Sequence, residues 1–245
     1  MTPYSTPCEH MDEWFVGFFE GDGSFQQGRD LAIVVTQKET HILHTIQQHY
    51  QRGAVLAQKA DGSVSRFIVR KQKDIIFFVK LLHKKLRLCT RQAQYTRFVK
   101  ECERRYAPFS FPEQKLLPLE ECAWLSGFID AEGCFHARLG KKTYKQRIQF
   151  HLGQKHDKQI LYAIRDVFKK GSVSNYTPAS SFQYTLTGIK NMSFLLEYVD
   201  CFPLRSKKAI AYTKWKKILV LLQQKKHLSQ GFRPKLQKLM QDINK

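Results

Sequence analysis

The stretch WFVGFFEGDGSF, residues 14 to 25, is an apolar run that ends in two carboxylates, each followed by glycine. The same arrangement returns 110 residues later in WLSGFIDAEGCF, residues 124 to 135, with Trp, Gly, Phe, Gly and Phe in the same register. The chain therefore contains two copies of one unit, and each copy ends an apolar segment with acids. In chain order, these acids are Glu20, Asp22, Asp130 and Glu132.

Both stretches predict an α-helix that ends at the acids, which we call the motif helices. TPCE at residues 6 to 9 supplies a capping box for the first motif helix. Pro118 is expected to open the second, because two glutamates follow it in a first turn that favours acids. Gly23 and Gly133 are expected to end the two helices in the left-handed conformation.

Alternating polar and apolar residues after each motif helix predict strands, and the spacing between strands predicts further helices. Each copy then contains a helix, a two-stranded hairpin, a helix, two more strands and a helix. Two such copies predict an α+β fold of two pseudo-symmetric αββαββα-type units, each with a four-stranded antiparallel sheet, packed about a twofold axis. The predicted segments are hairpins at 25–37 and 135–152, helices ending before Gly53 and Gly171, strands at 65–72 and 181–188, and helices at 74–86 and 191–200.

The repeat also predicts the domain boundaries. Residues 1–106 form the N-terminal repeat, and residues 107–118, which lie in a stretch with three prolines, form a linker. Residues 119–245 form the C-terminal repeat, and its basic segment from Lys207 onward is expected to form terminal helices.

Composition points to a polyanionic partner. The 245 residues include 41 Lys and Arg against 21 Asp and Glu, for a formal net charge of +20. The 42% hydrophobic content suffices for a large core, and no apolar run reaches the 18 or so residues of a membrane span. The six cysteines are far apart and lack zinc-binding spacing, which predicts a reduced compartment and no structural zinc. The N-terminus lacks both a signal core and an Arg-rich presequence.

Acids at the end of a helix face the negative end of its dipole, which costs about 0.3 to 1 kcal/mol each. A single such end after an apolar helix is typical of a solvated cap, but two in register indicate a function. Four small residues would let the helices approach closely, so that Asp22 and Glu132 lie side by side and repel unless a cation such as Mg²⁺ binds between them. Glu20 and Asp130 point in another direction and are interpreted as supporting or capping groups. The four small residues are Gly17, Gly21, Gly127 and Ala131.

FVGFFEGDG (15–23) and LSGFIDAEG (125–133) resemble the motif of the LAGLIDADG homing endonucleases in the single-chain form with two motifs. The resemblance covers essentially the whole chain. It implies a site-specific double-strand DNA endonuclease whose sheets form a DNA-binding saddle along the major groove, with the motif helices over the minor groove. It also implies hydrolysis with divalent metal ions, held at Asp22 and Glu132 with the neighbouring Gly21 and Ala131.

The resemblance implies further site residues. Gln37 and Gln154 correspond to glutamines that position metal-bound water. A basic residue follows the last sheet of family members, and Arg205 or Lys207 fits in the second half. Cys89 stands at that place in the first half, which indicates asymmetry between the two cleavage centres. The first-half candidates for this role are Arg87 and Arg91.

Specificity is expected from polar strand faces, because Arg pairs well with guanine and Gln with adenine in the major groove. Lysines at the tip of the second hairpin are expected to contact phosphate. Three histidines on one predicted helix are interpreted as surface or packing residues. The predicted DNA-contacting residues are Gln26, Arg29, Arg66, Arg70, Gln72, Arg138, Lys141, Lys142, Lys145, Arg147, Gln149 and Gln183, and the histidines are His41, His44 and His49.

The resulting prediction is a monomer that binds a long asymmetric site on double-stranded DNA and no membrane. Mg²⁺ is the expected cofactor, Mn²⁺ a substitute, and Ca²⁺ an ion that binds without supporting cleavage. One alternative is a maturase that binds intron RNA, alone or as a dual role, and another is a DNA-binding regulator without cleavage. An intron product encoded in a mitochondrion or chloroplast is expected, and an archaeal or free-standing origin is the alternative.

Overall fold

The computed structural model describes residues 10–58, 63–140, 145–176 and 180–244. The chain divides into two compact units, Met1–Ala131 and Glu132–Lys245. The predicted linker, residues 107–118, contains neither helix nor strand. Because the second motif helix packs on the first, nearly all of it is counted with the first unit. The repeat boundaries given by the sequence stay a prediction.

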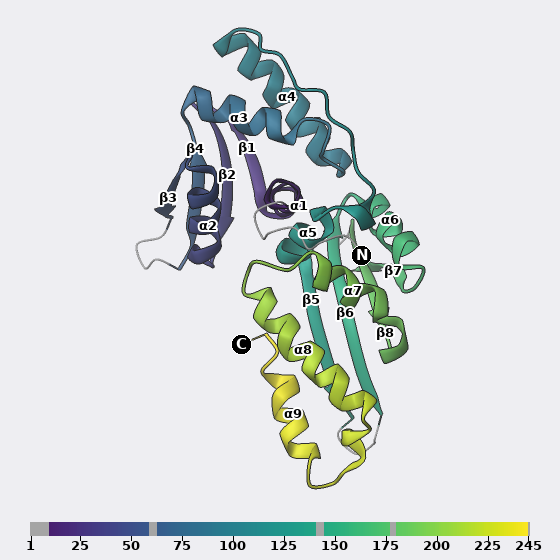
Figure 1. The fold of residues 1–245 in the computed structure, drawn as a ribbon. Helices are drawn as coiled ribbons and strands as arrows, with labels where there is room; N and C mark the ends of the chain where they lie inside the picture. The colour runs from purple at the N-terminus through teal and green to yellow at the C-terminus, as the bar shows by residue number, and fades with distance from the viewer. Residues whose placement is uncertain (1–9, 59–62, 141–144, 177–179, 245) are drawn as a thin grey trace. The chain divides into compact units, whose positions relative to one another are not determined.

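The first unit consists of one four-stranded antiparallel sheet with helices packed on it (Figure 1). The strand order is β1-β2-β4-β3, so the hairpin predicted from the sequence forms one half of the sheet. The elements are α1 (Met11–Asp22), β1 (Gly23–Gln27), β2 (Leu31–Gln37), α2 (Thr40–Tyr50), β3 (Ala54–Ala57), β4 (Ser65–Val69), α3 (Gln72–Leu82), α4 (Cys89–Tyr106), the 3₁₀ turn η1 (Leu119–Glu121) and α5 (Trp124–Glu132).

The second unit repeats this sheet with the order β5-β6-β8-β7, also fully antiparallel. The predicted α+β class with a four-stranded antiparallel sheet in each half is therefore confirmed. None of the helices described is long and apolar enough to cross a bilayer. The elements are β5 (Gly133–Leu139), β6 (Gln146–Lys155), α6 (Lys158–Phe168), β7 (Ser172–Tyr176), β8 (Ser181–Thr187), η2 (Ile189–Asn191), α7 (Ser193–Cys201), α8 (Lys208–Gln223), η3 (Lys226–Leu228) and α9 (Arg233–Gln241).

Each sheet buries one face under its helices; residues alternate between buried and exposed along β5, whereas the first five residues of β2 are all apolar and buried. In the first unit, Phe25 of β1 contacts Phe98 of α4, with ring centroids 4.9 Å apart. In the second unit, Phe135 of β5 lies 5.4 Å from the ring of Trp215 in α8. We call the opposite face of each sheet its open face.

The two motif helices, α1 and α5, meet through their glycines. A Cβ atom at Gly17 would lie 1.9 Å from the carbonyl oxygen of Trp124, and one at Gly127 would lie 1.8 Å from that of Trp14. No side chain fits between the helices at these positions. The predicted close approach of the motif helices is therefore confirmed at both glycines.

Several local predictions were wrong. Gly23 has φ −86° and ψ 165°, because β1 begins there directly and no left-handed turn is needed; Gly133 likewise is the first residue of β5. Pro118 precedes a 3₁₀ turn, and the second motif helix begins only at Trp124. The predicted strand at 65–72 ends at Val69, and the helix α4 was not predicted. The capping box at residues 6 to 9 lies outside the described residues.

Candidate active site

Asp22 is the last residue of α1, and the chain turns into β1 at the next residue. Its carboxylate is half-buried and accepts a hydrogen bond from Nε2 of Gln37 at 2.5 Å. Gln37 ends β2, two residues beyond Val35, the partner of Gly23 in the sheet. Strand pairing therefore brings together the acid and the glutamine that the sequence predicted for the first site.

The second half has the same register. Glu132 ends α5 and is half-buried, and the following Gly133 pairs with Leu152 of β6. Gln154 lies two residues beyond Leu152, as Gln37 lies two beyond its own pair. The amide of Gln154 donates to the carbonyl of Lys155 at 3.3 Å, whereas the amide of Gln37 donates to the acid of its motif. The two glutamines therefore have different hydrogen-bond partners.

Glu20, the other acid of the first motif, is buried with 1% of its surface exposed. Its carboxylate accepts hydrogen bonds from the backbone N–H groups of Arg87 at 2.8 Å and Leu88 at 2.7 Å, just before α4 begins. Burial nevertheless raises the pKa of Glu20 to about 7, because desolvation outweighs these donors. As predicted, Glu20 is a supporting group, and it holds the backbone of the segment that leads into α4.

Glu20 and Asp130 also join the two motif helices reciprocally. The indole Nε1 of Trp124 donates to Glu20 at 2.6 Å, and the indole Nε1 of Trp14 donates to Asp130 at 2.8 Å. All four side chains are buried. Sequence reasoning missed these bonds, although an acid six residues after a tryptophan in both copies is a signal for them.

The two candidate arginines of the first half have different surroundings. Nε of Arg91 donates to the carbonyl of Glu20 at 3.1 Å, and its Nη2 lies 3.5 Å from the carbonyl oxygen of Gly21. The Arg91 guanidinium therefore lies at the negative end of α1, where it contacts the carbonyls of the two residues that precede Asp22. The carbonyl of Gly21, a predicted metal ligand, already accepts from this cation.

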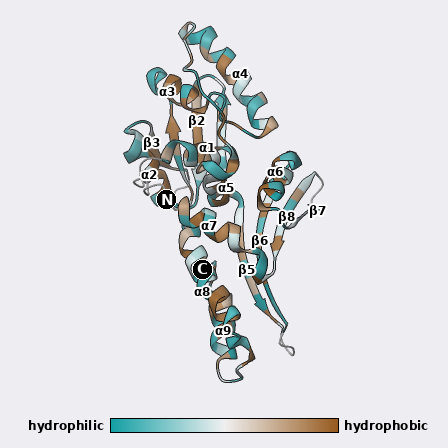
Figure 2. Ribbon diagram, turned by 45° about the vertical axis from the view of Figure 1, so that its right-hand side comes forward, coloured by the Kyte–Doolittle hydropathy of each residue, from teal (hydrophilic) through white to brown (hydrophobic). Residues whose placement is uncertain are grey.

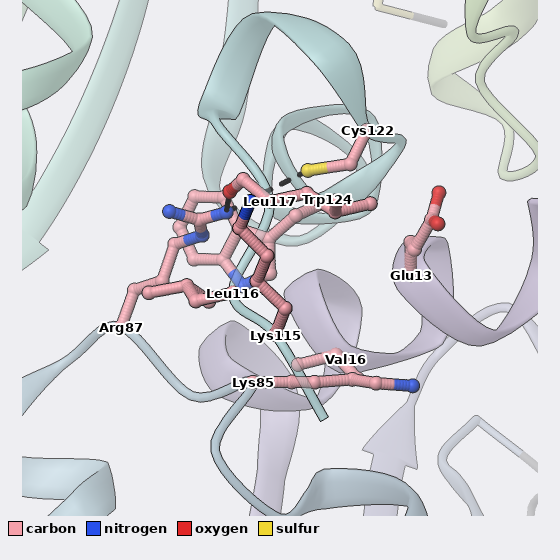
Figure 3. Close-up of a pocket in the computed structure, with 9 residues that line it drawn as sticks. All are labelled: Glu13, Val16, Lys85, Arg87, Lys115, Leu116, Leu117, Cys122 and Trp124. Carbon is pink, nitrogen blue, oxygen red and sulfur yellow. Dashed lines mark hydrogen bonds between the residues drawn. The ribbon is translucent and has the colours of Figure 1, made fainter. Parts of the chain in front are cut away.

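Arg87 points elsewhere, into a cavity of about 50 Å³ lined by α1, the 115–117 segment and the start of α5 (Figure 3). Its guanidinium lies 5.4 Å from the Trp124 ring centroid and donates to the carbonyl of Leu117 and to Sγ of Cys122. These contacts tie Arg87 to the linker. Of the two arginines, Arg91 is thus the one at the acidic end of α1.

The remaining candidates lie just before or at the start of the second α-helix after the last strand of each sheet. Cys89 is exposed as the first residue of α4. In the second unit, Arg205 is half-buried in the segment that leads to α8, and Lys207 is exposed directly before that helix.

The open face of the second sheet is polar throughout, as predicted. Arg138 pairs with Arg147, and Gln149 pairs across the sheet with Thr187 and donates to its hydroxyl at 3.1 Å. Gln183 lies farther along the same face and Lys145 is exposed at its end, whereas Lys141 and Lys142 lie outside the described residues.

Two histidines also lie on this open face, and the predicted DNA-contacting residues did not include them. His136 is exposed, and His151 shares a hydrogen bond of 3.0 Å with Thr185. Burial and the nearby His136 lower the pKa of His151, which favours the neutral form of its ring. Their alternation with Arg138 and Gln149 along β5 and β6 is the signal that could have identified them.

The open face of the first sheet is less polar. Gln26 and Arg66 project from it, but Ala32, Val34 and Ile68 form a buried apolar cluster between them. Figure 2 accordingly shows β2 mostly in the hydrophobic colour. The other predicted contacts of the first sheet lie at its rim: Arg29 is in the β1–β2 turn, Arg70 follows β4, and Gln72 begins α3 and is no strand residue.

The three histidines of α2 are all exposed, as predicted. The described residues contain no cluster of three or more His, Cys, Asp or Glu side chains that could hold a metal by itself. The predicted donors are instead carboxylate and carbonyl oxygens, at Asp22 and Glu132 and the residues before them. This donor set suits a hard cation that takes one or two carboxylates and completes its coordination with water and phosphate.

Comparison with known proteins agrees with this arrangement. Residues 125–219 match the family model described as LAGLIDADG endonuclease. The chain is 30% identical over 226 residues to the Neurospora crassa protein named "Probable intron-encoded endonuclease 4", covering 87% of this chain and 41% of that protein. It is 25% identical over 227 residues to the Schizosaccharomyces pombe "Uncharacterized cox1 intron-2 37.2 kDa protein", covering 89% of this chain and 68% of that protein.

Two solved structures share the fold. The LAGLIDADG meganuclease I-AabMI bound to uncleaved DNA has a TM-score of 0.79 at 18% identity, covering 95% of this chain and 99% of that chain. The I-LtrWI LAGLIDADG homing endonuclease bound to target DNA has a TM-score of 0.75 at 16% identity, covering 95% of this chain and 97% of that chain. The repeated motif, the sequence match and the shared fold together place this chain in the LAGLIDADG endonuclease family, in its single-chain form with two motifs.

Proposed function

We propose that this chain is a site-specific double-strand DNA endonuclease that hydrolyses one phosphodiester bond in each strand across the minor groove. One observation carries the proposal: Asp22 and Glu132 each end a motif helix directly before the residue where a strand of a four-stranded sheet begins. Each acid thus lies at the end of a sheet whose open face carries predicted DNA-contacting side chains.

The two acids and their neighbours have separate roles in this proposal. Asp22 and Glu132 hold the metal, and Gln37 keeps the carboxylate of Asp22 in one orientation through its amide. Gln154 has the corresponding role in the second half. Arg91 in the first half, and Arg205 or Lys207 in the second, supply positive charge near the phosphate that reacts.

We propose Mg²⁺ as the physiological metal, with Mn²⁺ as a substitute and Ca²⁺ binding without cleavage. When bound, the metal activates water and neutralises charge on the phosphate and the leaving oxygen. The oxygen donors at both helix ends support this choice. Gly21 is the weaker candidate ligand, because Arg91 already occupies its carbonyl.

The proposed partner is a long, asymmetric duplex site, bound by a monomer. The two open faces differ, since the second is lined with Arg, Gln, Thr and His and the first contains the apolar cluster of Ala32, Val34 and Ile68. Two unlike faces favour a target whose halves differ. Relatives named for introns support a protein encoded in an intron of an organellar genome, and the cox1 name favours the mitochondrion over the chloroplast.

The test pairs cleavage with binding. The full chain is incubated with a library of randomised duplexes in Mg²⁺, cut products are sequenced, and the recovered site is used for all variants. Asp22→Asn and Glu132→Gln are expected to slow cleavage at least 100-fold while the Kd for the site in Ca²⁺ stays within about threefold of the parent. Their melting temperatures should not fall, because each change removes a charge from the negative end of a helix.

Cleavage at the parental rate by both variants would refute the assignment of these acids. Absence of any Mg²⁺-dependent cleavage, with DNA binding retained, would favour the regulator. Selective binding of intron RNA over duplex DNA would favour the maturase, which no observation on this chain specifically supports.

A further inference from the structure

Helix α9 lies against β5, an edge strand of the second sheet, and has no counterpart after α4 in the first unit. A groove of about 360 Å³ runs between them, lined by His136 and Arg138 on the strand and by Gln237 and Gln241 on the helix. Both strand residues belong to the open face. The helix thus continues that face beyond the edge of the sheet.

Three side chains fix this segment to the backbone of β5 and its turn. Trp215 of α8 donates to the carbonyl of His136 at 3.1 Å, and Asn244 donates to that of Phe135 at 3.1 Å. Arg233 at the start of α9 donates to the carbonyl of Gly140. Leu236 and Met240 are buried beneath the helix. The groove therefore has two walls held in a fixed geometry, which lowers the entropic cost of binding a ligand there.

The wall formed by α9 is cationic and rich in amide donors. Gln237 and Gln241 are one turn apart, and the exposed Lys238 lies three residues before Gln241 on the adjoining surface. Lys235 is exposed one turn earlier. Asp242 is the one acid among residues 226–245, which carry five Lys and Arg. Such a surface suits a phosphate backbone, since lysines and amides make many of the contacts to phosphate oxygens.

We propose that α9 is a second DNA-binding element, which contacts the phosphate backbone through Lys235, Lys238 and the two glutamines while β5 faces the bases. The inference rests on the proposed function, because its ligand is the duplex bound by the open faces. It assigns the terminal helix to affinity and positioning, and assigns base recognition near it to His136 and Arg138.

The experiment compares two double variants with a matched control. Lys235→Ala/Lys238→Ala and Gln237→Ala/Gln241→Ala are measured against Gln159→Ala/Lys217→Ala, whose residues are exposed on α6 and α8. Those helices pack on the other face of the sheet. Melting temperatures establish that all three fold. Kd is then measured for the recovered site and for an unrelated duplex from 50 to 300 mM KCl.

The lysine variant should bind both duplexes about 5-fold more weakly per lost contact at 0.15 M salt, and the slope of log Kd against log salt should fall by about 1 to 2. The glutamine variant should weaken binding to both duplexes by the same factor, with an unchanged base preference in the cut library. Values equal to the control would overturn the inference. The inference would also be overturned if the lysine variant changed the base preference in the cut library and left the slope of log Kd against log salt unchanged, since α9 would then be a base-reading element. If the parent chain binds no duplex, both the proposed function and this inference are refuted. If the parent binds and cuts, the variants test the inference alone.

Discussion

Replacing Gly127 by alanine tests the contact between the motif helices. The added Cβ would lie 1.8 Å from the carbonyl oxygen of Trp14, whereas such contacts essentially never fall below 3.0 Å, so the helices must separate by about 1 Å. The clashing atom is backbone and cannot rotate away. Alanine gains about 1 kcal/mol in helix propensity, but overpacking costs about 1 to 3 kcal/mol in ordinary cores. Since the backbone fixes the positions of both the added Cβ and the carbonyl oxygen, we expect a net loss of about 2 kcal/mol or more in the free energy of unfolding.

The assay is urea denaturation of the full chain, followed by tryptophan fluorescence. Gly28→Ala is the control, because a Cβ there meets nothing within 4 Å, and it should stay within about 0.5 kcal/mol of the parent. Gly17→Ala should behave like Gly127→Ala. The double variant should lose at least about 1 kcal/mol less than the sum, because helices already separated relieve the second clash. A Gly127→Ala protein as stable as the Gly28→Ala control would refute the reasoning.

Two further predictions concern charge. Burial raises the pKa of Glu20 to about 7 from an ordinary value of 4.5, so its contribution to stability is fully present below about pH 4.5 and is lost as the pH rises through about 7. The free energy of unfolding should therefore fall between pH 5 and 8 more in the parent than in Glu20→Gln, by at most about 3 kcal/mol, and equal pH profiles would contradict the assigned pKa. The net charge of +20 should make DNA affinity fall on the order of 10³-fold between 50 and 200 mM salt, as expected for about six phosphate contacts. A flat salt dependence of Kd would mean that the basic side chains do not face DNA.

The repeated pattern of apolar run, paired acids and glycine predicted the two-fold repeat and most secondary-structure elements of this protein from sequence alone. Helical and strand periodicities are local, so they predicted α1 to Asp22, the hairpins and the alternating faces of β5 and β6. The same locality explains the errors. A glycine directly after an apolar helix is typical of a left-handed helix end, so the sequence predicted that conformation for Gly23. Its backbone is extended instead, because β1 begins at Gly23 and pairs with β2. Pro118 and Gln72 were misplaced for the same reason.

Only the tertiary structure separated the acid that serves packing from the acid that is a candidate metal ligand. The sequence proposed two acids per motif. Side-chain contacts from distant segments then separated Glu20, buried under three N–H donors, from Asp22, half-buried beside Gln37. The choice between Arg87 and Arg91 likewise depended on where residues 115–124 and the end of α1 lie in space. Local periodicity carries no information on such contacts, because they join residues 15 to 116 positions apart and are set by strand pairing and helix packing.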